Sequence, residues 1–166
     1  NYMTLVSSLK MNESDSTTCN ALYKCFSDIE RIGDHAINII QYSTDEDNKL
    51  SSSKYIEDEL HQLASLLSKS FSLLSTYSLD SQDECFEKIE RIEDRIDELT
   101  ASYRQAQIER LMEKKVNALD CVIYSEILTD VERVSDHIMN IIQEAKRCNF
   151  TLSDEAIQSD PALSAA

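Results

Sequence analysis

One pattern occurs twice in this sequence, and it indicates two long helices. Residues 30–40 read ERIGDHAINII and residues 132–142 read ERVSDHIMNII, so the two copies are offset by 102 residues. In each copy Glu, Asp and Asn recur at intervals of four residues. A helix turns through about 100° per residue, so this spacing stacks the three side chains along one face. A fold with two equivalent polar helix faces is therefore expected.

Apolar residues at helical spacing extend this expectation to most of the chain. The pattern predicts helices at about residues 15–43, 53–77, 81–114 and 117–147. The chain has one Gly and one Pro, and no stretch alternates as a strand does. The predicted fold class is therefore all-α, an antiparallel helical bundle.

Local signals mark where these helices begin. Ser81 followed by Glu84 matches a capping box, and Asn117 is a suitable N-cap for the last helix. Residues 1–10 resemble the end of a helix that begins upstream, and residues 151–166 lose periodicity, as a flexible tail does. Because the sequence begins with Asn, we expect it to be a piece of a longer protein.

The net charge of −15 limits the kinds of partner. Such an acidic chain repels phosphate backbones, which argues against nucleic-acid binding and favours cations or a basic partner surface. The five cysteines form no CxxC pair and predict reduced thiols in a cytosolic protein. No apolar run approaches the length of about 20 residues that a membrane-spanning helix needs.

The repeated polar stripes are expected to border the core. Relative to Glu30, we place Asp34 and Asn38 on one face, while His35 points outward with its counterpart His137. Four residues of the first copy are expected on the core side: Ile29, Gly33, Ala36 and Ile40. Cys19 and Cys121, which are also equivalent in the repeat, are expected to point inward.

A further acidic pair suggests what the stripes do. Glu93 and Asp97 are again four residues apart, and in an antiparallel bundle they can face Glu132 and Asp136. Like charges at a half-buried seam are costly unless a cation bridges them or protons are taken up. Oxygen ligands suit Mg, Mn, Ca or Fe. The alternative is a solvated acidic face on a metal-independent adaptor bundle.

An enzyme is not expected. The di-iron enzymes of helix bundles need Glu-x-x-His, but Gly33 and Ser135 stand three residues after the two repeated glutamates. No phosphate-binding glycine loop and no Ser/His/Asp or Cys/His pattern stands out. No residue pattern indicates a catalytic base other than the proposed metal ligands themselves.

The motifs resemble those of a known family. DIERIGDHAINI (residues 28–39) and DVERVSDHIMNI (130–141) are similar to the paired signature of the PhoU family, whose members regulate phosphate uptake. Residues 93–115 resemble the stretch before the second signature in the PhoU-like C-terminal cytoplasmic domain of bacterial sodium/phosphate cotransporters. The resemblance implies a tandem repeat of three-helix bundles, with a partly truncated first repeat at 1–78 and a second at 79–150.

The resemblance also implies ligands and a role. Some members bind metal clusters through these acidic motifs, which implies a divalent metal (Fe, Zn, Mg or Mn) in this chain. The implied ligands are Glu30, Asp34 and Asn38 at a first site, and Glu93, Asp97, Glu132, Asp136 and Asn140 at a second.

The expected function is regulation of a sodium-dependent phosphate transporter, at the cytoplasmic face of the membrane. Its partner would be the transporter domain of the same polypeptide. Homo-oligomer formation is left open. The alternatives are a free-standing PhoU-like regulator of phosphate uptake and the metal-independent adaptor.

Overall fold

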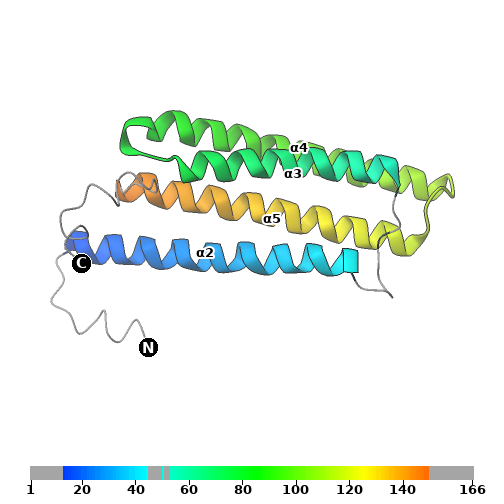
Figure 1. The fold of residues 1–166 in the computed structure, drawn as a ribbon, viewed down its shortest axis with the longest axis horizontal. Helices are drawn as coiled ribbons and strands as arrows, with labels where there is room; N and C mark the ends of the chain where they lie inside the picture. Colours follow the sequence, from blue (N-terminus) through cyan, green and yellow to red (C-terminus); the bar gives the residue numbers. More distant parts are fainter. Residues whose placement is uncertain (1–12, 45–49, 51–52, 150–166) are drawn as a thin grey trace.

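The computed structural model describes residues 13–44, 50 and 53–149. Four long helices lie side by side along its longest axis: α2 (Glu13–Thr44), α3 (Lys54–Ser75), α4 (Gln82–Met112) and α5 (Ala118–Cys148) (Figure 1). A short 3₁₀ turn, η1 (Leu79–Ser81), leads into α4. No strand occurs in the described part of the chain, so the predicted all-α bundle is confirmed.

The helix α5 is the centre of the arrangement. It runs antiparallel to α2 on one side and packs against the α3–α4 pair on the other (Figure 1). The largest fully buried side chains include Leu63 of α3, Ile89 and Ile96 of α4, and Tyr124 and Leu128 of α5. The main core therefore lies between α3, α4 and α5, and α2 adds to it from the side.

The predicted helix boundaries agree with the structure to within about two residues, but one predicted cap does not form. The Asn117 side chain accepts a hydrogen bond from the backbone N–H of Asp120 at 2.8 Å, as expected of an N-cap. Ser81 makes no side-chain cap at α4, and its hydroxyl lies 2.9 Å from that of Ser78. The capping-box prediction was wrong because the chain enters α4 through the turn η1.

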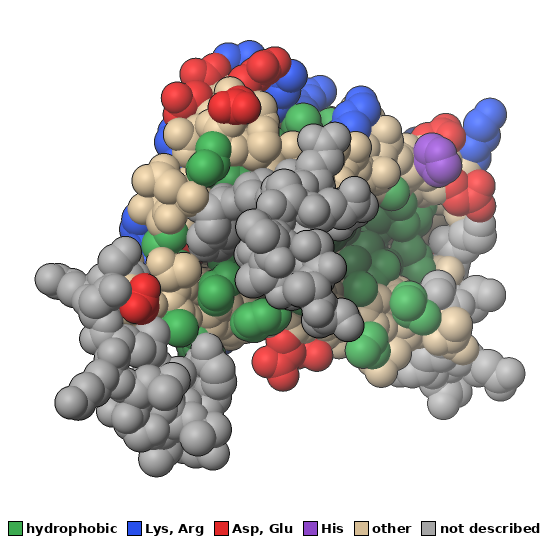
Figure 2. Space-filling view, turned by 60° about the vertical axis from the view of Figure 1, so that its left-hand side comes forward, with side chains coloured by type: hydrophobic (Ala, Val, Ile, Leu, Met, Phe, Trp, Pro, Cys, Tyr) green, Lys and Arg blue, Asp and Glu red, His purple; other side chains and the backbone are tan. Residues whose placement is uncertain are grey.

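The outer face of α2 differs from its counterpart on α5. Phe26 is 66% exposed and Ile40 is 59% exposed, whereas the equivalent Leu128 and Ile142 of α5 are fully buried. Figure 2 shows hydrophobic side chains in a recessed part of one face. The α3–α4 pair covers α5, and no described helix covers α2 in the same way.

This difference corrects the expected core side of the first repeat. Ile29, Gly33, Ala36 and Ile40 are exposed, not buried. The same pattern is right for α5, where Val131, Ser135, Ile138 and Ile142 are buried. Helical spacing identified an apolar face correctly, but burial depends on whether another helix lies against it.

Other expectations have mixed outcomes. The five cysteines are free thiols; Cys25 and Cys85 are buried, whereas Cys19 and Cys121 are only half-buried. None of the described helices combines the length and hydropathy that a membrane crossing requires. The predicted N-terminal helix end (1–10) and the predicted tail (151–166) lie outside the described residues.

Candidate functional site

Two histidine–aspartate pairs cross between α2 and α5. His35 Nδ1 of α2 lies 2.7 Å from Asp130 Oδ1 of α5, and His137 Nδ1 of α5 lies 2.8 Å from Asp28 Oδ1 of α2. A carboxylate can only accept, so each ring nitrogen donates the hydrogen bond. The prediction that His35 and His137 lie on the outward face was therefore wrong.

This cluster, which we name the His–Asp clamp (Asp28, His35, Asp130 and His137), is reciprocal. Asp28 of the first copy pairs with His137 of the second, and Asp130 of the second copy pairs with His35 of the first. This exchange arises because two copies of one motif, offset by 102 residues, face each other on antiparallel helices. The two imidazole rings stack with centroids 5.7 Å apart and an interplanar angle of 23°. The clamp therefore ties the two signature copies together.

Two predicted metal ligands contact the clamp. Asn38 Nδ2 donates to Asp130 Oδ1 and Asn140 Nδ2 donates to Asp28 Oδ1, each at 3.4 Å. Helical geometry on a single helix could not reveal these cross-helix contacts. The available signal was the shared spacing of Asp, His seven residues later and Asn ten residues later in both copies.

A second cluster lies between α4 and α5. We name it the acidic seam: Glu93, Asp97, Glu132 and Asp136. Burial raises the pKa of Glu93, and the neighbouring carboxylates of Asp97 and Asp136 raise it further. Burial, followed by the charges of Glu132 and Asp136, also raises the pKa of Asp97. The structure thus brings these four residues within electrostatic reach of one another.

One member of the acidic seam already has a cationic partner. Arg104 donates to both oxygens of Glu132, at 2.6 and 2.7 Å, and Thr100 donates a third, very short hydrogen bond. Burial alone would raise the pKa of Glu132, but these hydrogen bonds hold it below its usual range. The bonds to Glu132 also raise the pKa of Arg104. Sequence reasoning missed both Arg104 and Thr100.

The first predicted site is less developed. Glu30 and Asp34 are exposed on α2, and in the described part of the chain no second carboxylate pair faces them as Glu93 and Asp97 face α5. Within the described residues, no group of three or more Asp, Glu, His or Cys side chains is gathered closely enough to hold a metal ion.

The donor chemistry nevertheless fits a cation better at the acidic seam than at Glu30 and Asp34. Carboxylate oxygens are the ligands that hard cations prefer. Burial first, and then repulsion between carboxylates, raises the pKa values of Glu93 and Asp97, and a cation would offset both effects. Holding a cation with all four carboxylates would require Glu132 to exchange Arg104 for the metal.

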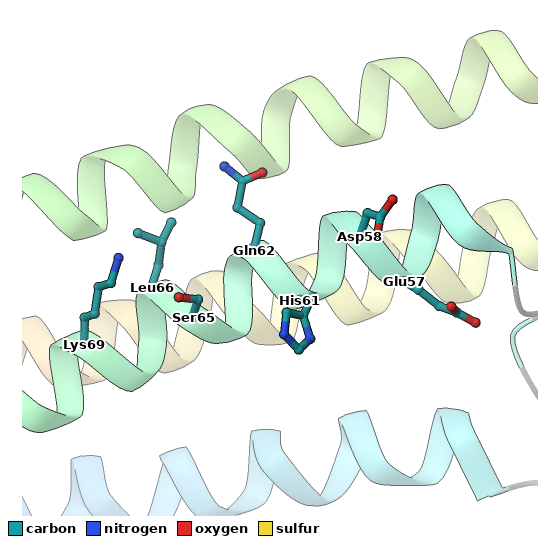
Figure 3. Close-up of a pocket in the computed structure, with 7 residues that line it drawn as sticks. All are labelled: Glu57, Asp58, His61, Gln62, Ser65, Leu66 and Lys69. Carbon is teal, nitrogen blue, oxygen red and sulfur yellow. The ribbon is translucent and has the colours of Figure 1, made fainter.

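An open pocket of about 640 Å³ lies along α3, away from both clusters (Figure 3). His61 and Glu57 line it, and Figure 3 shows both side chains pointing away from α4. His61 has no ionic partner among the described residues. None of the residues that line this pocket is a predicted metal ligand.

Comparison with known proteins places the second copy of the motif in a known family. The family model described as "PhoU domain" matches residues 58–145, which cover most of α3, all of α4 and most of α5. The predicted boundary between repeats, at residues 78 and 79, lies inside this matched stretch.

Two curated proteins are similar over three quarters of the chain. The "Phosphate-specific transport system accessory protein PhoU homolog 1" of Thermotoga maritima is 28% identical over 126 residues, 74% of this chain and 53% of that protein. A PhoU homolog of the same transport system from Deinococcus radiodurans is 24% identical over 125 residues, 75% of this chain and 58% of that protein. The chain thus spans little more than half the length of these relatives. No solved structure gives a significant match.

Proposed function

Because the chain belongs to the PhoU domain family, we propose that it is a regulatory, non-enzymatic module that modulates phosphate uptake. The observation that carries this proposal is the doubled signature, whose two copies pair reciprocally through the His–Asp clamp. Both relatives are named as accessory proteins of phosphate transport. A role through contacts and conformation fits these features.

We propose further that the module acts on a sodium-dependent phosphate transporter, as a cytoplasmic domain of the same polypeptide. The resemblance of residues 93–115 to the corresponding stretch of the cotransporter domains supports this assignment. A free-standing PhoU-like regulator fits the comparisons about as well. The two versions differ in whether membrane-spanning segments belong to the same chain.

Divalent metal binding is the chemical part of the proposal. The acidic seam is the preferred site, since Glu93 and Asp97 make no ion pair with any described residue, and burial and repulsion raise their pKa values, that of Asp97 despite the nearby charge of Arg104. Asp136 makes only a long contact of 3.3 Å to Arg133. A bound cation would supply the positive charge that this seam lacks. We rank the Glu30–Asp34 face second.

The decisive experiment is phosphate uptake in cells that lack the gene. Deletion should alter the uptake of radiolabelled phosphate, and re-expression of the natural protein should restore it. Variants Asp97→Asn and Asp136→Asn should restore it less well if metal binding matters. Unchanged uptake in the deletion strain at both low and high external phosphate would overturn the regulatory role.

Fractionation separates the two versions. An antibody against residues 53–149 should detect a membrane-embedded polypeptide much larger than 18.9 kDa if the transporter domain is on the same chain. A band that washes off the membrane at high salt would favour the free-standing regulator. Restoration of uptake by variants that bind no metal would favour the metal-independent adaptor.

A further inference from the structure

A pocket of about 400 Å³ lies beside the His–Asp clamp, between α2 and α5. Five of the side chains that line it have hydrogen-bond donors left for a ligand: Lys24, Ser27, Arg31, Asn140 and Gln143. Two carboxylates, Asp28 and Glu144, also line it. The pocket is therefore rich in donors although the chain as a whole is strongly acidic.

Both carboxylates of the pocket are already engaged. Glu144 accepts from Lys24 at 2.7 Å and from Arg147 at 2.6 and 2.9 Å. Burial alone would raise the pKa of Glu144, but these two cations hold it below its usual range. Asp28 accepts from His137 in the clamp. Glu144 is therefore neutralised by cations, whereas Asp28 keeps its charge and is held by hydrogen bonds from His137 and Asn140.

Arg31 is the lining cation that is not used in an ion pair with a described residue, since Lys24 pairs with Glu144. The two cations that line the pocket, Lys24 and Arg31, equal its two carboxylates in number, and Arg147, outside the lining, adds a second cation to Glu144. Arg31 makes no ion pair with any described residue, whereas its repeat counterpart Arg133 bonds Asp136 at 3.3 Å. A free guanidinium beside neutral donors is the group that best matches a phosphate oxygen pair.

The repeat itself shows that this charge pattern is specific to one side. At the equivalent positions around the other clamp pair, Lys24 is replaced by Glu126 and Glu144 by Tyr42. Replacing the lysine by a glutamate reverses the charge at this position in the other half. Two halves that share the clamp thus differ in the residues that would attract or repel an anion.

We propose that the α2–α5 pocket binds a phosphate group. Arg31 and Lys24 supply the charge, and Ser27, Asn140 and Gln143 supply neutral hydrogen bonds. The choice of phosphate over another oxyanion rests on the proposed function, whereas the pocket and its charge do not. His137 and Asn140 belong to both pocket and clamp, so a bound phosphate would contact the residues that join the two signature copies.

The proposal is tested with the purified chain in a chelating buffer at constant ionic strength. Inorganic phosphate is titrated while backbone amide NMR shifts are followed, with sulfate and phenyl phosphate in parallel. Saturable shifts should cluster on α2 around residues 24–31 and on α5 around residues 137–144. Loss of a charged hydrogen-bond partner should weaken affinity about tenfold or more in Arg31→Ala. Lys24→Glu, which installs the residue of the other repeat, should abolish the shifts.

The matched control is Arg133→Ala, the same change at the equivalent repeat position, which should alter phosphate affinity less than about twofold. Absence of saturable shifts at 20 mM phosphate, or equal weakening by both arginine variants, would overturn the pocket. Sulfate that binds as tightly as phosphate would overturn the phosphate assignment only. Phenyl phosphate that binds more tightly than inorganic phosphate would assign the pocket to a phosphomonoester. Uptake in the deletion strain tests the regulatory role separately.

Discussion

Replacing Arg104 tests how the acidic seam is balanced. Arg104 donates two short hydrogen bonds to Glu132 and a third, at 3.1 Å, to Thr129. Both charged side chains are half-buried. Arg104→Met keeps the apolar stem of the side chain but removes the charge. Glu132 would then add its uncompensated charge to those of Asp97 and Asp136.

The size of the effect follows from the burial. Breaking a fully buried ion pair costs about 3–5 kcal/mol and an exposed one about 0–1 kcal/mol, so this half-buried pair should be worth about 2 kcal/mol. For a chain of this length, that loss corresponds to a fall in Tm of about 4–8 °C. The assay is thermal unfolding followed by circular dichroism in a chelating buffer.

A matched control is available on the same helix. Arg95 pairs with Glu98 at the exposed surface of α4, and Arg95→Met should lower the Tm by at most about 2 °C. Added Mn²⁺ or Mg²⁺ should then raise the Tm of Arg104→Met more than that of the natural protein, because Glu132 is free to join the seam. A fall no larger than the control's would refute the reasoning about the ion pair. A fall as expected with no response to any cation would refute the cation site alone.

Three further outcomes follow from the same contacts. Burial and neighbouring carboxylates raise the pKa of Asp97, so its protonation stabilises the fold at low pH. This contribution is lost as the pH rises through the folded-state pKa. Asp97→Asn should therefore raise the metal-free Tm at pH 7 by about 1–2 °C and flatten its pH dependence. His137→Ala should cost about 1–3 kcal/mol in denaturant unfolding, because Asp28 loses its main donor, whereas His61→Ala should be neutral. Burial raises the pKa of Cys25 to about 11, so at pH 8 iodoacetamide should alkylate it at least about 100-fold more slowly than the half-buried Cys121, as read by mass spectrometry.

Much of the fold could be predicted from local chemistry. Apolar spacing located all four described helices, and the polar Asn117 located the start of α5. These features depend on residues close together in sequence, which a single helix decides. The failed cap at Ser81 shows the limit, since the turn η1 gives its hydroxyl another partner.

The site could be predicted only in part, because its contacts join helices. A helical wheel placed His35 away from the acidic stripe, which is correct, but it contained no information on which helix would lie there. The same limit applies to Arg104, whose partner Glu132 is 28 residues away. Equivalence between repeats was the remaining signal, and it correctly grouped Asp28 with Asp130 without showing that they belong to opposite pairs.

The consecutive residues Asp136 and His137 show why α5 is the element on which regulation would converge. Asp136 faces the acidic seam toward α4, and His137 faces the clamp toward α2. A charge introduced on either side changes the forces on the same helical turn, since neighbouring helical residues point about 100° apart. A cation in the seam would remove repulsion between α4 and α5, and a phosphate in the α2–α5 pocket would contact the clamp directly. Because both helix pairs share α5, the two ligands would act on one packed element, and effects of one on the affinity for the other would be reciprocal.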